Sequence, residues 1–338
     1  MSPTRVTLAS LAAGSALLVA VLVQASARPA NLGADSGYMY GYLPSVVLHH
    51  DLDFSDDALP FDSSMPHTAT GRAHNVFPMG PAMLWAPGFV AGHAVAATAR
   101  LAAVRSGPAA DGRSWPYDVL VGLAGLWVGV LAVWATFALA RRWASTWAAT
   151  LATVAIWVAG PLVYYTHVEP MRSHAPAVAS VALLLLLWLR VRDRPGSSLW
   201  PVAALGTLGG VVALSRWQNG VFLLGPAIDA ARGHLRQRRA PDAAALFLMA
   251  GTAVAVFSPQ LLVWNSLYGS PFRAPSGGGF LDLHRLHVVD VLFSWRHGLL
   301  SWHPVLAVGL AGLLLAARRR PLPALSLLGA FVLTTLIN

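Results

Sequence analysis

Long runs of uncharged, mostly apolar residues recur along the chain, and short segments between them hold the charged side chains. An α-helix needs about 20 apolar residues to cross the hydrocarbon core of a bilayer, and several runs approach or exceed that length. The pattern predicts an all-α polytopic membrane protein with about nine transmembrane helices. The runs are Val6–Ala27, Val119–Ala140, Trp143–Thr166, Ala175–Leu189, Ser197–Ser215, Trp217–Ile228, Ala243–Pro271, Pro304–Ala317 and Pro321–Asn338. The short run Trp217–Ile228 is expected to return beside Ser197–Ser215 as the second arm of a hairpin.

The two ends of the chain raise separate questions. Ala25-Ser26-Ala27 resembles a signal-peptidase site, so Val6–Ala27 could be a cleaved signal. Its apolar part is longer than the roughly 7–15 residues of a signal h-region. We therefore expect a retained span whose N-terminus lies in the cytoplasm. The chain stops at Asn338 directly after an apolar run, and we expect the sequence to be a fragment of a longer one.

Composition agrees with a membrane protein. Only 11% of the 338 residues are charged and the mean hydropathy is +0.58, whereas soluble domains carry about 25% charged residues. The formal charge of +9 comes from arginine alone and falls in clusters, so it indicates membrane topology rather than nucleic-acid binding. Four clusters are expected in the cytoplasm, at Arg141-Arg142, Arg190–Arg194, Arg232–Arg239 and Arg318–Arg320. The connections around His167–Ser173, Arg216–Asn219 and Ser266–His303 then face outward. The chain has no cysteine for disulfides or thiolate chemistry.

One further apolar stretch, Gly80–Ala99, does not fit this alternation. A spanning helix there would invert every later loop and place the arginine clusters outside. It contains Pro81, Pro87 and His93. We expect an interfacial or re-entrant helix on the outer face. The whole chain, residues 1–338, is then a single membrane domain with a first outer insert at 28–116 and a late outer loop at 266–303.

The first insert holds the most concentrated polar chemistry of the chain. Six of the fourteen acids of the whole chain lie within Gly33–Pro87. Asp35 opens the phrase Asp35-Ser36-Gly37-Tyr38 a few residues beyond the first predicted span. If Tyr38–Leu43 starts a short helix, Asp35-Ser36 could simply cap it. The functional alternative is a general base at the membrane boundary.

A second acidic segment of the insert runs from His49 to Asp57. Asp51 and Asp53, with the neighbouring His side chains, are of types that could hold a divalent cation, but the spacing matches no EF-hand. A solvated turn is the preferred interpretation, and no cofactor is expected.

The outward connector at His167–His174 offers another set of polar side chains. Glu169 is the only Glu in the chain, and Arg172 and His174 follow it. Two His and a carboxylate could bind zinc, but Pro170 prevents a helical i, i+4 ligand pair. Contact with a substrate is the preferred prediction for Glu169, Arg172 and His174.

Two later outward segments carry candidate phosphate ligands. Arg216 and Gln218 lie at the tip of the short hairpin, where an arginine costs roughly 2.5–3.5 kcal/mol on insertion scales unless it has a partner. Snorkelling to lipid headgroups and binding of an anionic phosphate both remain open for Arg216. Arg296 and His297 belong to the late loop. The triple glycine at Gly277–Gly279 suits a flexible loop that lies over a site.

The order of these features resembles the GT-C superfamily of polytopic glycosyltransferases, specifically bacterial relatives of protein mannosyltransferases and aminoarabinose transferases. The resemblance rests on one span, Asp35-Ser36-Gly37-Tyr38, Tyr42-Leu43-Pro44, Pro78-Met79-Gly80-Pro81, the Glu169 connector and the Arg216 hairpin. It implies juxtamembrane helices in the first outer loop and a catalytic carboxylate at Asp35. Relatives often carry a Lys before the Pro-rich phrase, where this chain has Val76-Phe77.

The expected activity follows from that resemblance. A sugar would pass from a polyprenyl-phosphate donor to a glycan, lipid or protein acceptor on the outer face of the plasma membrane, with Asp35 as base and inversion at the anomeric carbon. Arg216, assisted by Arg172 or Arg296, would stabilise the phosphate. A transporter or lipid flippase is the alternative, but such proteins show internal symmetry and charges at mid-membrane. A non-catalytic scaffold is the third.

Overall fold

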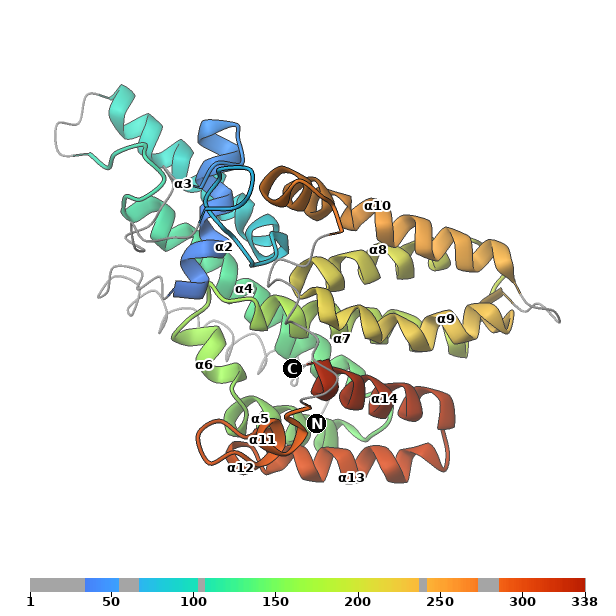
Figure 1. Ribbon diagram of the computed structural model, residues 1–338. Coiled ribbons are helices and arrows are strands. Elements are labelled where there is room, and N and C mark those ends of the chain that lie inside the picture. Colours follow the sequence, from blue (N-terminus) through green and yellow to red (C-terminus); the bar gives the residue numbers. More distant parts are fainter. Residues whose placement is uncertain (1–33, 55–66, 103–106, 237–241, 273–285, 338) are drawn as a thin grey trace. The chain divides into compact units, whose positions relative to one another are not determined.

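The computed structural model describes residues 34–54, 67–102, 107–236, 242–272 and 286–337, and all the regular structure in these ranges is helical (Figure 1). An isolated bridge joins His67 to Ala73. The first predicted span, Val6–Ala27, lies outside the described residues. The helices are α2 (Ala34–Pro44), η1 (Ser45–His49), α3 (Gly80–Leu101), α4 (Trp115–Ala140), α5 (Thr146–Ala159), α6 (Leu162–His167), α7 (His174–Asp193), α8 (Trp200–Ser215), η2 (Trp217–Leu223), α9 (Leu224–Ala231), η3 (His234–Arg236), α10 (Ala243–Tyr268), α11 (Val288–Phe293), α12 (Leu299–Trp302), α13 (Val305–Ala317) and α14 (Pro321–Ile337).

Four of these helices, α3, α4, α7 and α10, are long and apolar enough to cross a membrane. Shorter apolar helices are α5, α8, α13 and α14. The all-α class predicted from the sequence is therefore confirmed for the described residues, and the four long apolar helices support a membrane protein. The number of spans stays a prediction. The stretch Gly80–Ala99, expected on the membrane surface, forms most of the continuous helix α3 despite Pro87.

One predicted span is wrong as a single element. The run Trp143–Thr166 forms two helices, α5 and α6, because the backbone becomes extended at Gly160 (φ −104°, ψ 176°) before Pro161. The ring of a proline disfavours a helical conformation of the residue before it, which explains the break. Ser145 caps the start of α5 by accepting a hydrogen bond from the Ala148 N–H at 3.3 Å.

The chain divides into two compact units, which are described separately. The first unit holds residues 1–131 and 163–176. Its α3 and α4 approach closely at glycines spaced four residues apart. A Cβ at Gly88 would lie 2.3 Å from the Leu120 carbonyl oxygen, and a Cβ at Gly92 would lie 2.9 Å from the Tyr117 Cα. Small residues at this spacing let helix backbones meet, as is typical of membrane helix pairs.

The same unit fixes α2 through its tyrosines. The Tyr40 hydroxyl donates to the Gly112 carbonyl at 2.6 Å, and the Tyr42 hydroxyl donates to the Phe77 carbonyl at 2.9 Å. Asn75 donates its side-chain amide to the Tyr38 carbonyl at 3.0 Å. Burial raises the pKa of Tyr40 far above its usual value, so this phenol stays a neutral donor. These bonds hold the helix that carries Asp35.

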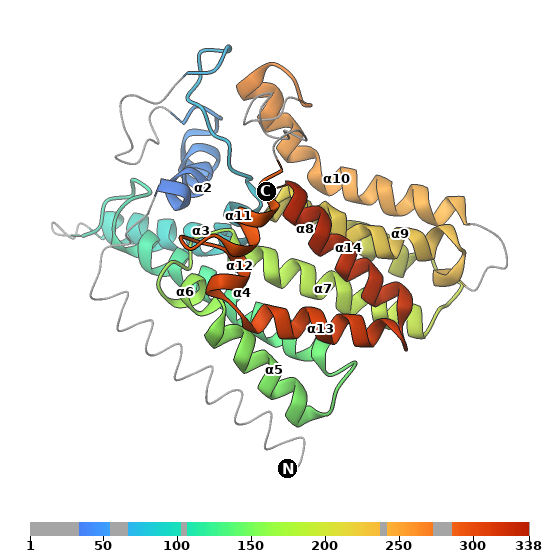
Figure 2. The same ribbon diagram turned by 60° about the horizontal axis from the view of Figure 1, so that its bottom comes forward.

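The second unit holds residues 132–162 and 177–338. Its core joins α7, α8, α9 and α10, which lie side by side in Figures 1 and 2. Glycines again set the closest approach: a Cβ at Gly206 would lie 2.2 Å from the Met249 carbonyl oxygen, and one at Gly210 would lie 2.7 Å from the Ala253 carbonyl oxygen. This unit therefore packs α8 directly on the backbone of α10.

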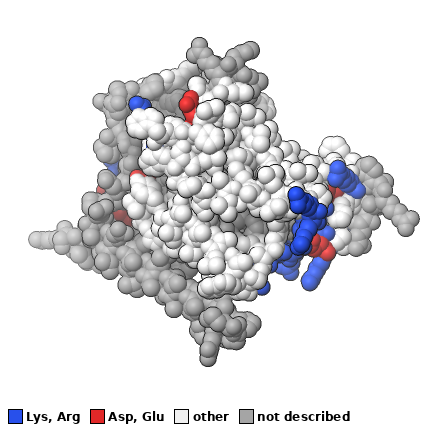
Figure 3. Space-filling model, turned by 90° about the horizontal axis from the view of Figure 1, so that it is seen from below, with Lys and Arg blue, Asp and Glu red and all other residues white. Residues whose placement is uncertain are grey.

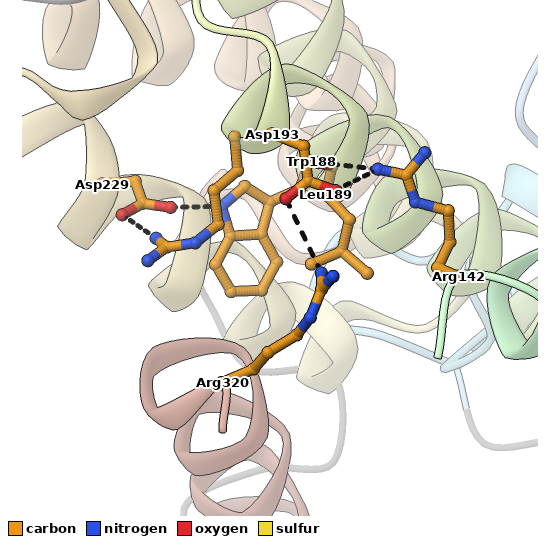
Figure 4. Close-up of polar contacts among 7 residues, drawn as sticks. Arg142, Trp188, Leu189, Asp193, Asp229 and Arg320 are labelled. Atoms are coloured by element: carbon orange, nitrogen blue, oxygen red, sulfur yellow. Dashed lines mark hydrogen bonds and ion pairs between the residues drawn. The ribbon is translucent and has the colours of Figure 1, made fainter. Parts of the chain in front are cut away.

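The predicted hairpin is present in the second unit. After α8 the backbone is extended at Arg216, and the 3-10 helix η2 then packs back on α8, with Leu223 against Gly209. The return arm continues into α9, whose Asp229 is 1% exposed. Asp229 accepts a hydrogen bond from the Trp188 indole at 2.8 Å (Figure 4) and forms an ion pair with Arg192.

Candidate functional site

Asp35 lies in the first turn of α2, one residue after the helix begins at Ala34. The predicted short helix over Tyr38–Leu43 is present, but Asp35 and Ser36 lie inside it and do not precede it as caps. A carboxylate in the first turn is still favourable, because the N-terminal end of a helix carries partial positive charge. The Asp35 side chain remains 45% exposed, so it is accessible from outside the first unit.

Arg172 joins Asp35 from a point 137 residues away in the sequence. Its Nη1 donates to the Asp35 Oδ2 at 2.8 Å, and its Nε faces Glu169 in a second ion pair. The side chains of Arg172 and Glu169 are only 22% and 18% exposed. One guanidinium thus faces two carboxylates, and the three groups carry a formal net charge of −1.

Tyr164 adds a phenol to this cluster. It hydrogen-bonds to the Glu169 side chain, and that bond, as the first cause, raises the pKa of Tyr164. The backbone supports the geometry, because the N–H groups of Val168 and Glu169 both donate to the Tyr164 carbonyl, at 2.8 and 3.1 Å. No role for Tyr164 was predicted from the sequence, although its place five residues before the single Glu of the chain was an available signal.

Helix α4 positions the connector that carries Glu169 and Arg172. A Cβ at Gly125 would lie 2.5 Å from the Pro170 carbonyl oxygen, and one at Gly129 would lie 2.5 Å from the Thr166 side chain. The connector therefore rests directly on the backbone of α4, at positions where only glycine fits without a shift. This contact fixes the residues on both sides of Pro170.

His174 begins α7 and closes the connector. Its ring stacks on Tyr165, with ring centroids 3.8 Å apart and an interplanar angle of 15°. The predicted substrate ligands Glu169, Arg172 and His174 thus belong to one short segment in the same unit as Asp35, and Arg172 brings Asp35 and Glu169 together.

Asp51 and Asp53 form a local turn. The Asp51 carboxylate accepts hydrogen bonds from the Ser45 hydroxyl at 3.1 Å and from the Asp53 N–H at 3.0 Å. This is the pattern of an Asx-type turn. Among the described residues no group of three or more His, Asp or Glu side chains could hold a metal ion, and Asp56 and Asp57 lie outside those residues.

The other predicted ligands belong to the second unit. Arg216 directly follows α8, and Gln218 lies in η2; both are partly buried. Arg296 is exposed, with its guanidinium carbon 5.3 Å from the centroid of the Trp295 ring, and His297 is exposed beside Trp302. The glycine-rich loop that precedes them lies outside the described residues.

Comparison with known proteins adds no relative. No family model, curated protein or solved structure matches the chain. The function is therefore inferred from the residues and their geometry.

Proposed function

We propose that this membrane protein transfers a sugar from a polyprenyl-phosphate donor to an acceptor hydroxyl on the outer face of the plasma membrane. The observation that carries the proposal is the state of Asp35: a carboxylate oriented by Arg172 yet 45% exposed, beside the less exposed Glu169. A general base must be fixed in position and must still reach its substrate. The proposal keeps about nine spans, an outward-facing site and the resemblance to the GT-C superfamily.

In the proposed reaction Asp35 removes the proton of the acceptor hydroxyl as its oxygen bonds to the anomeric carbon. The bond from that carbon to the phosphate oxygen breaks, and polyprenyl phosphate leaves with its electron pair. A single displacement of this kind inverts the anomeric centre. Arg172 orients Asp35 by its hydrogen bond.

The geometry changes the role proposed for Arg172. Because Arg172 already faces Asp35 and Glu169, its surroundings carry net negative charge and are unfavourable for the donor phosphate. Arg172 is therefore proposed as a positioning residue. The assignment of the phosphate to Arg216 and Arg296 stays a prediction from the sequence.

The test begins with the lipids that co-purify with the protein, which are extracted and searched for a polyprenyl-phosphate sugar by mass spectrometry. Transfer of that sugar is then measured for Asp35→Asn and Glu169→Gln, on protein whose folding has been checked. Asp35→Asn should lower turnover by about 10²–10⁴ with donor binding unchanged. Glu169→Gln should act more gently, mainly on substrate affinity, since it lies deeper and faces Arg172.

Two outcomes would change the proposal. If Asp35→Asn transfers at the parental rate and Glu169→Gln is inactive, the two carboxylates exchange roles. If no transfer occurs and the protein instead moves labelled lipid between the leaflets of reconstituted vesicles, the flippase alternative is correct.

A further inference from the structure

The second unit contains a cavity with an unusual lining. Its volume is about 620 Å³, and it lies where the turn after α4 meets the turn between α13 and α14. Four arginines line it, together with three apolar residues. The lining residues are Arg142, Trp143, Leu315, Ala316, Arg318, Arg319 and Arg320.

Asp193, at the end of α7, organises two of these arginines (Figure 4). It forms an ion pair with Arg142, whose guanidinium also donates to the Leu189 carbonyl at 3.3 Å, and it lies 3.6 Å from Arg320. Four arginines against one aspartate leave a formal charge of +3 around the cavity. Arg318 and Arg319 are exposed and form no ion pair with any acid in the described part of the chain.

The surface near the cavity separates charge from apolar area. Figure 3 shows arginine side chains gathered on one side of the view, while most of the described surface around them is uncharged. Helix α13 leads into the turn that carries Arg318–Arg320, and its Val308, Leu314 and Leu315 are 73%, 62% and 62% exposed. Such a helix surface suits lipid chains, and tryptophans such as Trp143 favour the boundary between lipid and water.

From this geometry we propose that the cavity binds the headgroup of an anionic phospholipid, with its acyl chains along the apolar surface of α13. Guanidinium groups bind phosphate oxygens in paired hydrogen bonds, and Asp193 holds Arg142 and Arg320 ready for such contacts. Arg318 and Arg319 supply the charge that Asp193 does not neutralise. A free phosphate would fill the charged part only, whereas a phospholipid also covers Trp143, Leu315 and Ala316. Arginine pockets at the cytoplasmic ends of membrane helices are suited to this role.

The test uses the purified full chain in detergent, titrated with phosphatidylglycerol and, separately, with phosphatidylcholine. Bound lipids are counted by native mass spectrometry. The Arg318→Gln/Arg319→Gln variant should lose about 30-fold in phosphatidylglycerol affinity, since each arginine near an anionic lipid contributes ~1 kcal/mol and each tenfold corresponds to ~1.4 kcal/mol. Its thermal unfolding should match the parent, because these two side chains form no described ion pair.

The matched control is Arg190→Gln/Arg232→Gln, which removes two exposed arginines that do not line the cavity. It should change phosphatidylglycerol affinity by less than about threefold, because neither side chain lines the cavity and the Coulomb effect of exposed charges is screened by salt. Equal losses in both double variants, or equal binding of phosphatidylcholine, would overturn the proposal. Displacement of the lipid by millimolar inorganic phosphate alone would show a free-anion site instead and would also overturn it.

Discussion

Replacing Gly125 by alanine tests how the connector at Glu169–Arg172 is positioned. The added Cβ would lie 2.5 Å from the Pro170 carbonyl oxygen and 3.0 Å from its carbonyl carbon. Real Cβ contacts are essentially never shorter than 3.0 Å, so α4 and the connector must separate by about half an ångström. Both partners are backbone, and no side chain can rotate to relieve the contact.

The cost can be separated from the helix propensity of alanine. Overpacking of this kind costs about 1–3 kcal/mol of unfolding free energy. Alanine also stabilises a helix by up to ~1 kcal/mol relative to glycine. Gly251→Ala supplies the control, because Gly251 lies within α10, is exposed, and has no described atom near its added Cβ. The propensity gain is common to both variants, so Gly125→Ala should be less stable than Gly251→Ala by roughly the overpacking cost.

Two measurements check this prediction. Thermal unfolding in detergent should show a lower Tm for Gly125→Ala, by roughly 2–4 °C for each kcal/mol. Since the chain has no cysteine, Ser173→Cys, at a position only 8% exposed, can report on the connector by its rate of thiol labelling. Labelling should be faster when Gly125→Ala is added. Unfolding like Gly251→Ala, with unchanged labelling, would show that α4 and Pro170 do not touch.

Two further predictions concern topology and the donor phosphate. A single cysteine introduced at Ser106 or Ser276 should react with an impermeant reagent added from outside, and one at Ser198 should not. Protection of the cysteine at Ser106 would mean that α3 spans the membrane and that the outer insert is smaller than proposed. Arg216→Ala should weaken binding of the polyprenyl-phosphate donor more than binding of the acceptor. Arg216→Lys should restore only part of the donor affinity, because an ammonium replaces a two-pronged guanidinium. Unchanged donor affinity of Arg216→Ala in a binding titration would leave Arg216 as a headgroup anchor.

Much of the fold could be predicted because apolar runs and helices follow the same physical rule. The runs at Val119–Ala140 and Ala243–Pro271 correspond to α4 and α10 within a few residues. The Gly160-Pro161 pair in the sequence could have indicated a helix break. The long uncharged run around it favoured a single span instead. The spacing of Gly206 and Gly210 could not by itself predict a close helix contact, because the sequence does not show which helix faces them.

The site was less predictable, because it depends on contacts between distant segments. The sequence indicated Asp35 and Glu169 as separate carboxylates, and it could not show that Arg172 pairs with both. The arginine cavity depends in the same way on the meeting of two turns that are far apart in sequence.

The buried pair of Asp229 and Arg192 has a consequence for how the chain enters the membrane. A buried charge that lacks its partner costs about 3–5 kcal/mol, and α9, which carries the buried Asp229, is only eight residues long. Asp229 is buried against Trp188 and Arg192 of α7, which are synthesised before it. We therefore expect the return arm of the hairpin to contact α7 before it leaves the translocation machinery. The helices of this region would then enter the membrane together and not one at a time.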